Sequence, residues 1–114
     1  MSGSRDLPDR LPGAIRAFVE TTNAGDSEGF VAAFTSDAVL DDWGRTFVGR
    51  DRIREWDRTD NIGVQSAFTV REVSPGPDRD AYVVTLEVRG NGYNGTGPMT
   101  FRLRDGLISS VTIG

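Results

Sequence analysis

Apolar residues near the start of the chain recur every three or four positions, as they do on one face of an α-helix. The pattern predicts a first helix from residue 11 to about residue 23, with Pro12 tolerated in its first turn. Ala24-Gly25 should end this helix, because glycine readily adopts the positive φ that follows a helix end. Asp26 should then cap a second helix. The apolar stripe of the second helix is expected to consist of Phe30, Val31 and Phe34.

The middle of the chain changes from helical spacing to alternating spacing and back. Residues 38–43 alternate weakly and predict a short strand, and residues 46–48 predict a second one. A third helix is expected from residue 50 to about residue 60, with Ile53 and Trp56 facing inward and its charged side chains facing solvent.

Four longer strands are predicted in the second half of the chain. The clearest covers residues 81–89, where Tyr82, Val84, Leu86 and Val88 share one face. Clean alternation implies an antiparallel sheet with one covered face, and a run of helices followed by a run of strands indicates an α+β fold. The remaining strands are expected at residues 65–73, 99–104 and 107–113, the last two joined by a two-residue turn at Asp105-Gly106.

The length and composition of the chain narrow its possible chemistry. Its 114 residues suffice for one domain, which we expect over residues 11–114 after a flexible lead-in of residues 1–10. Cysteine and histidine are absent, which excludes disulfides, a thiol nucleophile, the Ser-His-Asp triad and the usual zinc sites. Any catalysis must therefore use carboxylates, tyrosine, arginine, backbone groups or bound water, and we expect no metal or other cofactor.

Charge and hydropathy limit the classes of partner. A net charge of −4 gives no electrostatic case for nucleic-acid binding. No apolar run is long enough to cross a bilayer, and the first ten residues lack the apolar centre of a signal peptide. We therefore expect a cytoplasmic protein that contacts neither nucleic acid nor membrane.

Two stretches of the chain carry a family resemblance. One is the spacing of Phe18-Val19, Asn23-Ala24-Gly25-Asp26, Phe34 and Asp37-Ala38. The other is residues 36–56, which combine a carboxylate-bearing strand, a turn, a second short strand and a helix opening at Gly49-Arg50. In these features the sequence resembles the SnoaL-like branch of the NTF2-like superfamily, to which ketosteroid isomerases and polyketide cyclases are related. The resemblance implies a cone of three N-terminal helices packed on a strongly curved, mixed but mostly antiparallel sheet, with a pocket between them.

Asp42 is the candidate catalytic residue. By this resemblance it falls where ketosteroid isomerases carry their general-base aspartate. Strand alternation places Leu40 and Asp42 on one face and Asp41 on the other. A partly desolvated carboxylate on a pocket wall would have a raised pKa and could exchange protons with a ligand. The alternative is a structural role, in which Asp42 caps the turn at Gly44 or pairs with Arg45.

The rest of the isomerase site does not carry over. By the same resemblance its tyrosine falls at Phe18, which has no hydroxyl, and its oxyanion-hole aspartate falls near Met99, which cannot donate a hydrogen bond. Steroid isomerisation is therefore disfavoured, because such donors usually supply the largest catalytic contribution. The Asp-Arg-Asp arrangement of limonene epoxide hydrolases cannot be placed in this sequence either. SnoaL-like polyketide cyclases use an aspartate to move a proton during aldol ring closure, which keeps cyclase-like chemistry open.

The pocket wall is expected to be largely aromatic. Trp43 and Tyr93 are the two strongest choices, because each sits beside a glycine and carries a polar group that can orient a ligand. A purely structural role in the core is the alternative for each aromatic residue. The expected substrate-binding residues are Phe18, Phe34, Trp43, Trp56, Tyr93, Met99 and Phe101.

Two other patterns in the sequence bear on ligand binding. Asp37, Asp41 and Asp42 offer oxygen ligands, but Asp41 and Asp42 face opposite sides of a strand, which argues against one shared metal ion. The glycine-rich residues 90–95 match a dinucleotide fingerprint, but a strand and not a helix follows them, so no nucleotide site is predicted.

Two functions of different class therefore remain. The first is a domain that binds a small, largely apolar molecule in its pocket, with acid-base chemistry at Asp42. The second is a non-catalytic module that dimerises or binds another protein through the outer face of its sheet, and the two are compatible. That outer face is expected to present Gln65, Ala67, Thr69, Arg71, Val83, Thr85, Thr100, Arg102 and Thr112.

Overall fold

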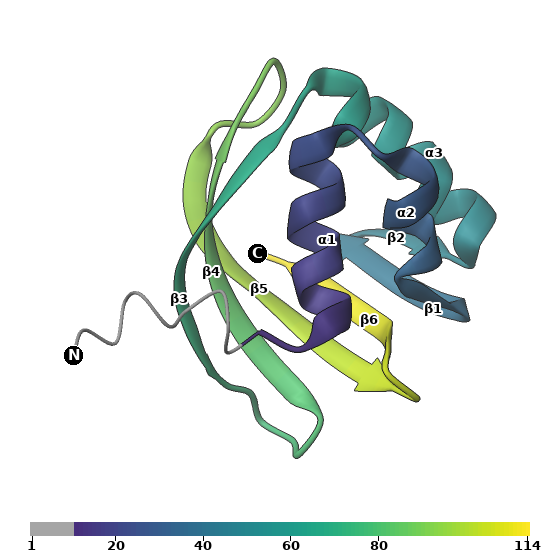
Figure 1. Cartoon of the computed structure of the whole chain (residues 1–114), viewed down its shortest axis with the longest axis vertical. Coiled ribbons are helices and arrows are strands. Elements are labelled where there is room, and N and C mark those ends of the chain that lie inside the picture. Colours follow the sequence, from purple (N-terminus) through teal and green to yellow (C-terminus); the bar gives the residue numbers. More distant parts are fainter. Residues whose placement is uncertain (1–10) are drawn as a thin grey trace.

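The computed structural model describes residues 11–114, so the expected flexible lead-in at residues 1–10 lies outside the described residues. The described chain begins with helices and ends with strands, as predicted (Figure 1). Its helical elements are α1 (Gly13–Ala24), α2 (Ser27–Ala32), α3 (Arg50–Asp60) and the short 3₁₀ helix η3 (Ile62–Val64). Its strands are β1 (Phe34–Asp42), β2 (Arg45–Val48), β3 (Ala67–Pro75), β4 (Ala81–Arg89), β5 (Gly95–Arg104) and β6 (Leu107–Ile113).

The six strands form one mixed sheet in the order β2-β1-β6-β5-β4-β3. β1 and β6 pair in parallel, whereas the other neighbours are antiparallel. The sheet curves around α1, and α2 and α3 close the concave side (Figure 1). The predicted α+β cone with a mixed, mostly antiparallel sheet is confirmed.

Local turn chemistry fixes several element boundaries. Gly25 ends α1 at a φ of 72°, and the Asp26 side chain accepts a hydrogen bond from the Gly29 backbone N–H at 3.0 Å, which caps α2. Asp105 and Gly106, at φ values of 56° and 79°, form the two-residue hairpin turn between β5 and β6. The sequence predicted all three features.

The position of Phe34 differs from the sequence prediction. It begins β1 and is not part of the apolar stripe of α2. The parallel neighbour β6 accounts for this, because Phe34 is in register with Ile108 and the Ile108 N–H donates to the Ala33 carbonyl at 2.9 Å. The Arg50 guanidinium also donates to the Phe34 carbonyl, at 2.6 and 3.0 Å, which satisfies the backbone at the start of the strand.

Two of the longer strands also begin at different residues from those predicted. β3 starts at Ala67 and not at Gln65, because Gln65 has a left-handed backbone with a φ of 58°. β5 starts four residues before Met99, since Gly95 pairs with Val88 of β4 and extends the ladder through a stretch without apolar alternation.

The core lies between α1 and the concave face of the sheet and is built around Phe18. Its ring lies 5.0–6.1 Å from the rings of four other phenylalanines, measured between centroids. Aromatic contacts of this kind add to the stabilisation from apolar burial. Phe18 packs against Phe30, Phe34, Phe68 and Phe101.

No helix within residues 11–114 is long and apolar enough to span a membrane.

Candidate functional site

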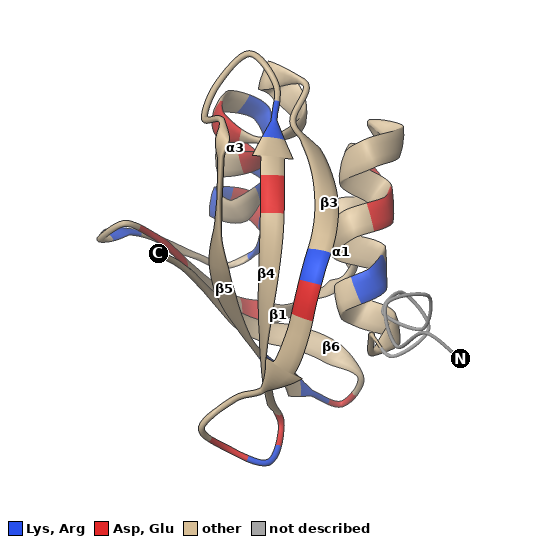
Figure 2. Ribbon diagram, turned by 90° about the vertical axis from the view of Figure 1, so that its left-hand side faces the viewer, with Lys and Arg blue, Asp and Glu red and all other residues tan. Residues whose placement is uncertain are grey.

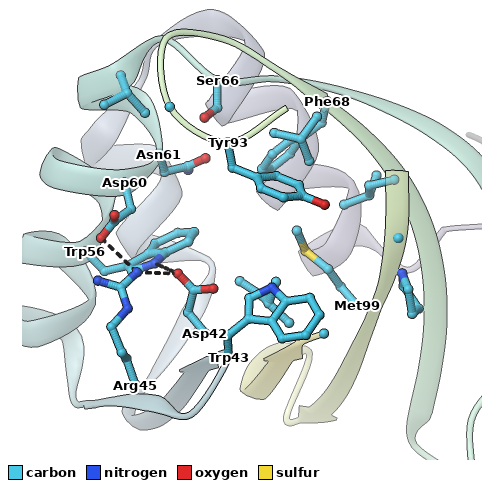
Figure 3. Close-up of a pocket in the computed structure, with 18 of the residues that line it drawn as sticks. Asp42, Trp43, Arg45, Trp56, Asp60, Asn61, Ser66, Phe68, Tyr93 and Met99 are labelled. Atoms are coloured by element: carbon cyan, nitrogen blue, oxygen red, sulfur yellow. Dashed lines mark hydrogen bonds and ion pairs between the residues drawn. The ribbon is translucent and has the colours of Figure 1, made fainter. Parts of the chain in front are cut away.

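An open cavity of about 560 Å³ lies between the concave face of the sheet and the C-terminal end of α3. The β1–β2 turn and the β4–β5 loop complete its wall (Figure 3). A mostly apolar cavity with a few polar groups is typical of sites for small organic molecules. The apolar part of the wall includes Trp56, Phe68, Leu86, Val88, Met99 and Ile113. The residues with polar side chains that line the cavity are Asp42, Arg45, Thr59, Asp60, Asn61, Ser66 and Thr96.

Asp42 ends β1 and has only 15% of its side chain exposed. Its Oδ2 accepts hydrogen bonds from Trp56 Nε1 at 3.0 Å and from Arg45 Nη2 at 2.6 Å (Figure 3). Its Oδ1 accepts no hydrogen bond from residues 11–114 and lies on the cavity side of the carboxylate (Figure 3). Asp42 is therefore held through one oxygen and presents the other to the cavity.

Arg45 lies between two carboxylates at the mouth of the cavity. Its Nη2 is 2.6 Å from Oδ2 of Asp42 and 3.4 Å from Oδ2 of Asp60. The hydrogen bond that Arg45 donates to Asp42, followed by the one that it donates to Asp60, raises the pKa of the guanidinium further above its ordinary value. Because Asp60 ends α3, this bridge ties the helix to the β1–β2 turn. The Arg45 side chain is 55% exposed, so solvent screening keeps each ion pair at about 1 kcal/mol or less.

The β1–β2 turn places an exposed tryptophan at the cavity mouth. Trp43 and Gly44 are its two central residues, with φ values of 52° and 90°, and Trp43 is 73% exposed. A positive φ is unfavourable for a bulky residue and costs about 1–3 kcal/mol, which the surrounding hydrogen bonds must offset. The Trp43 N–H donates to the Ile113 carbonyl at 3.2 Å, and Asp41 Oδ1 accepts from the Gly44 N–H at 2.9 Å. Asp41, and not Asp42, therefore caps this turn.

A second polar cluster lies behind the wall at the C-terminal end of α3. Asp57 and Asn61 are each 1% exposed, and Asn61 Nδ2 donates to Asp57 Oδ1 at 3.0 Å. Burial raises the pKa of the Asp57 carboxyl, against the opposing hydrogen bonds from Asn61, Ser27 and the Ile62 backbone and the charge of Arg54. Only Asn61 of the Asp57-Asn61 pair lines the cavity.

Sequence comparison assigns the family. The model of the SnoaL-like domain matches residues 15–111. The chain belongs to the SnoaL-like domain family. No curated protein matches it.

Several solved structures share the fold of this SnoaL-like domain. A candidate polyketide cyclase from Sinorhizobium meliloti is 23% identical, with a TM-score of 0.85 over 95% of this chain and 99% of the other. A Mycobacterium tuberculosis protein in complex with estradiol-17beta-hemisuccinate is 20% identical, with a TM-score of 0.75 over 87% and 88% of the two chains. The epoxide hydrolase/cyclase-like enzyme SalBIII, of pyran ring formation in the polyether salinomycin, is 20% identical, with a TM-score of 0.75 over 98% and 92%. At these identities the likeness shows the NTF2-like fold alone.

The SnoaL-like domain brings five of the predicted site residues to one cavity. Asp42 and Trp56 lie in contact, whereas Trp43 and Tyr93 lie at the ends of separate hairpins. Tyr93 is 58% exposed, so it stands with Trp43 at the open part of the wall. The five residues on the wall are Asp42, Trp43, Trp56, Tyr93 and Met99.

Phe18, Phe34 and Phe101 do not line the cavity, contrary to the sequence expectation. Each is 0% exposed, and the Phe18 ring contacts both of the others at centroid distances of 6.1 and 5.0 Å. They fill the core of the cone behind the wall. Alternation along a strand identified the correct face for Phe101, but it does not tell how deeply along the cone a residue lies.

Sequence reasoning missed Asp60, Asn61 and Ser66, which the fold brings to the cavity from the end of α3 and the start of β3. The sequence offered the Asp42–Arg45 pair as an alternative role for Asp42, but its extension to Asp60 could not be read from the sequence, because it joins a strand to the end of a helix. The one available signal was Asn61, a polar residue between a predicted helix and a predicted strand.

Asp37 lies apart from this site. Hydrogen bonds from Arg104 and then Thr35 lower the pKa of its carboxyl. Residues 11–114 contain no group of acidic side chains that could hold a metal ion.

Proposed function

We propose that the cavity binds a small, largely apolar organic molecule and that Asp42 exchanges a proton with it. The observation that carries this proposal is the carboxylate of Asp42, which is mostly buried, anchored through Oδ2 and open to the cavity through Oδ1. A fixed carboxylate beside a bound molecule is suited to general acid-base catalysis. Isomerase-like or cyclase-like proton transfer is the reaction class that this arrangement supports best.

The environment of Asp42 supports a defined geometry for proton transfer. Trp56 is 4% exposed, so its indole N–H is a fixed donor that restricts rotation of the carboxylate. Arg45 adds a charged donor from the solvent side. Tyr93 places a phenol on the same cavity wall, where it can orient a carbonyl or hydroxyl of the bound molecule.

The test uses 2-tetralone, a compact ketone whose α-protons exchange slowly with solvent. In D₂O, a base removes an α-proton to give the enolate, and a deuteron from solvent then replaces it, so proton NMR follows the exchange directly. The wild-type domain should accelerate this exchange above the buffer rate, and Asp42→Asn should lose at least about 10²-fold of the acceleration. Asp41→Asn is the matched control, because Asp41 faces away and an asparagine side chain can still cap Gly44.

Equal exchange rates for wild type and Asp42→Asn would contradict the catalytic part of the proposal. Asp42→Asn should also keep the fold. It loses an ion pair to an exposed arginine but retains an acceptor for Trp56, so we expect it to cost about 1 kcal/mol of unfolding free energy. A normal melting profile would show that any loss of exchange is chemical.

We also propose, as a second and compatible function, that the domain forms a homodimer through the outer face of its sheet. Val83, Thr100 and Thr112 stand side by side across β4, β5 and β6 in the register of the sheet. In Figure 2 the middle of β4 and of β5 carries no charged residue, whereas Glu87 and Arg89 lie toward one end of β4. A surface of threonine and valine can be buried against a second copy, and the charged residues beside it, Arg71, Glu87 and Arg89, are already paired with one another. Sedimentation at micromolar concentration should give a dimer that Thr100→Glu dissociates, and a wild-type monomer would contradict this.

A further inference from the structure

The amide of Asn61 is locked in one orientation behind the cavity wall. Its Nδ2 donates to Oγ1 of Thr22 at 3.0 Å and to Oδ1 of Asp57 at 3.0 Å. An ionised carboxylate only accepts hydrogen bonds, so the nitrogen side of the amide must face Asp57. The amide oxygen is thereby directed to the opposite side, which is the cavity (Figure 3).

The amide oxygen of Asn61 is an unused acceptor. Asn61 is 1% exposed, and its Oδ1 accepts no hydrogen bond from residues 11–114. No fully enclosed side-chain polar atom of the described residues lacks a partner, so this oxygen must open onto the cavity. A ligand that covers this oxygen without donating to it leaves a buried acceptor without a partner, which weakens binding, whereas a ligand with a suitable donor satisfies it.

Ser66 supplies a second unused polar group at the same end of the cavity. It is 6% exposed, and its hydroxyl makes no hydrogen bond with the residues of the described chain. The Ser66 backbone N–H donates to the Asn61 backbone carbonyl at 3.0 Å, which holds the two residues together. Figure 3 shows both side chains on the wall at the end of the cavity away from Arg45.

We propose that Asn61 and Ser66 form a recognition site for a hydroxyl group of the ligand, which rests on the proposed function of the cavity. A hydroxyl donates one hydrogen bond and accepts others, so it can donate to Asn61 Oδ1 and accept from the Ser66 hydroxyl. A carbonyl or ether oxygen in the same place would leave the Asn61 acceptor without a partner. The favoured ligand is therefore a compact apolar molecule that carries an alcohol or a phenol.

Asp57 is the positioning residue of this site. It does not line the cavity, and it acts by fixing which side of the Asn61 amide faces the ligand. An asparagine at position 57 could either donate or accept, so the Asn61 amide could then turn over and present its N–H₂ to the cavity. The identity of residue 57 should therefore change the preference for ligand donors without any contact with the ligand.

The experiment compares 2-naphthol with 2-methoxynaphthalene by isothermal titration calorimetry at neutral pH. The two probes share a planar apolar body, but only 2-naphthol can donate a hydrogen bond. The wild-type domain should bind 2-naphthol about tenfold more tightly, the ratio expected for one buried hydrogen bond. Asn61→Leu should reduce that ratio while the ether still binds. Ser66→Ala removes a donor that the oxygen of either probe can accept from, so it should weaken the binding of 2-naphthol. Thr85→Val, on the outer face of the sheet, is the control and should leave the ratio unchanged.

Asp57→Asn keeps the test decisive if Asn61→Leu fails to fold, because it releases the constraint on the amide while the asparagine oxygen can still accept from Ser27 or the Ile62 N–H. It should reduce the preference for 2-naphthol. An equal wild-type affinity for both probes, or an unchanged ratio in folded Asn61→Leu or Asp57→Asn, would overturn the hydroxyl site and leave the cavity proposal standing. If wild type binds neither probe, the cavity proposal fails and the hydroxyl site falls with it.

Discussion

Trp56→Phe tests whether the indole N–H holds the candidate catalytic carboxylate. The change keeps an aromatic ring at a position that is 4% exposed and removes the donor at 3.0 Å from Asp42 Oδ2. A hydrogen bond to a charged group contributes about 1.5–3 kcal/mol, and the partial exposure of Asp42 places this one near the lower value. The smaller ring also leaves a gap beside Phe30, whose ring centroid is 6.1 Å from that of Trp56, which adds about 1 kcal/mol.

The expected loss is therefore about 2–3 kcal/mol of unfolding free energy, or roughly 8–20 °C in melting temperature for a domain of this size. Urea unfolding followed by circular dichroism measures it without relying on tryptophan fluorescence. The matched control is Trp43→Phe, because Trp43 is 73% exposed and its replacement should change stability by no more than about 0.5 kcal/mol. Equal losses for the two variants would refute the argument that Trp56 anchors Asp42.

Three further predictions concern the fold around the site. Burial raises the pKa of Asp57, so the folded state binds the carboxyl proton more tightly than the unfolded state does. The contribution of Asp57 to the free energy of unfolding therefore falls as the pH rises from about 3.9 through the folded pKa. The stability of Asp57→Asn relative to wild type should therefore increase over that range in denaturant titrations at several pH values, and a difference that does not change with pH would contradict this. Phe18→Ala should cost about 3–5 kcal/mol by opening a void among four aromatic rings, as urea unfolding would show, and a loss below about 1 kcal/mol would mean that the cluster is loosely packed. Gly63→Ala should lower the free energy of unfolding by about 1–3 kcal/mol, because a Cβ there would overlap the Arg58 carbonyl. Gly13→Ala has open space around it and should raise the free energy of unfolding by about 0.4–1 kcal/mol. Equal shifts in the melting temperatures of the two variants would contradict this difference.

Local patterns predicted the elements of this fold well where the local signal was complete. The bounds of α3 and β4 agree with the prediction, since each has clean periodicity and clear turn residues at its ends. Phe34 was misplaced because an apolar residue four positions after Phe30 fits a helix, whereas pairing with β6 draws it into the sheet. That pairing depends on a strand more than 70 residues away, which no local pattern reveals.

The candidate site was predicted less completely than the fold. Asp42 and Trp56 could be placed near each other, because one lies on a strand face and the other on a helix face that cover the same core. Periodicity could not separate wall from core, which is why Phe101 was expected at the cavity and is instead fully buried. Asn61 could not be assigned a role from the sequence, because its role comes from three-dimensional contacts with Thr22 and Asp57.

A titration of the ¹⁵N-labelled domain with 2-naphthol tests the central claim most directly, because each backbone and indole N–H reports its own surroundings. Binding in the cavity should shift the Trp56 indole N–H and the backbone resonances of Asn61 and Tyr93, with one common saturation curve. Shifts confined to Thr85 and neighbouring residues on the outer face of the sheet, or no saturable shift at all, would contradict the claim that the cavity is the ligand site.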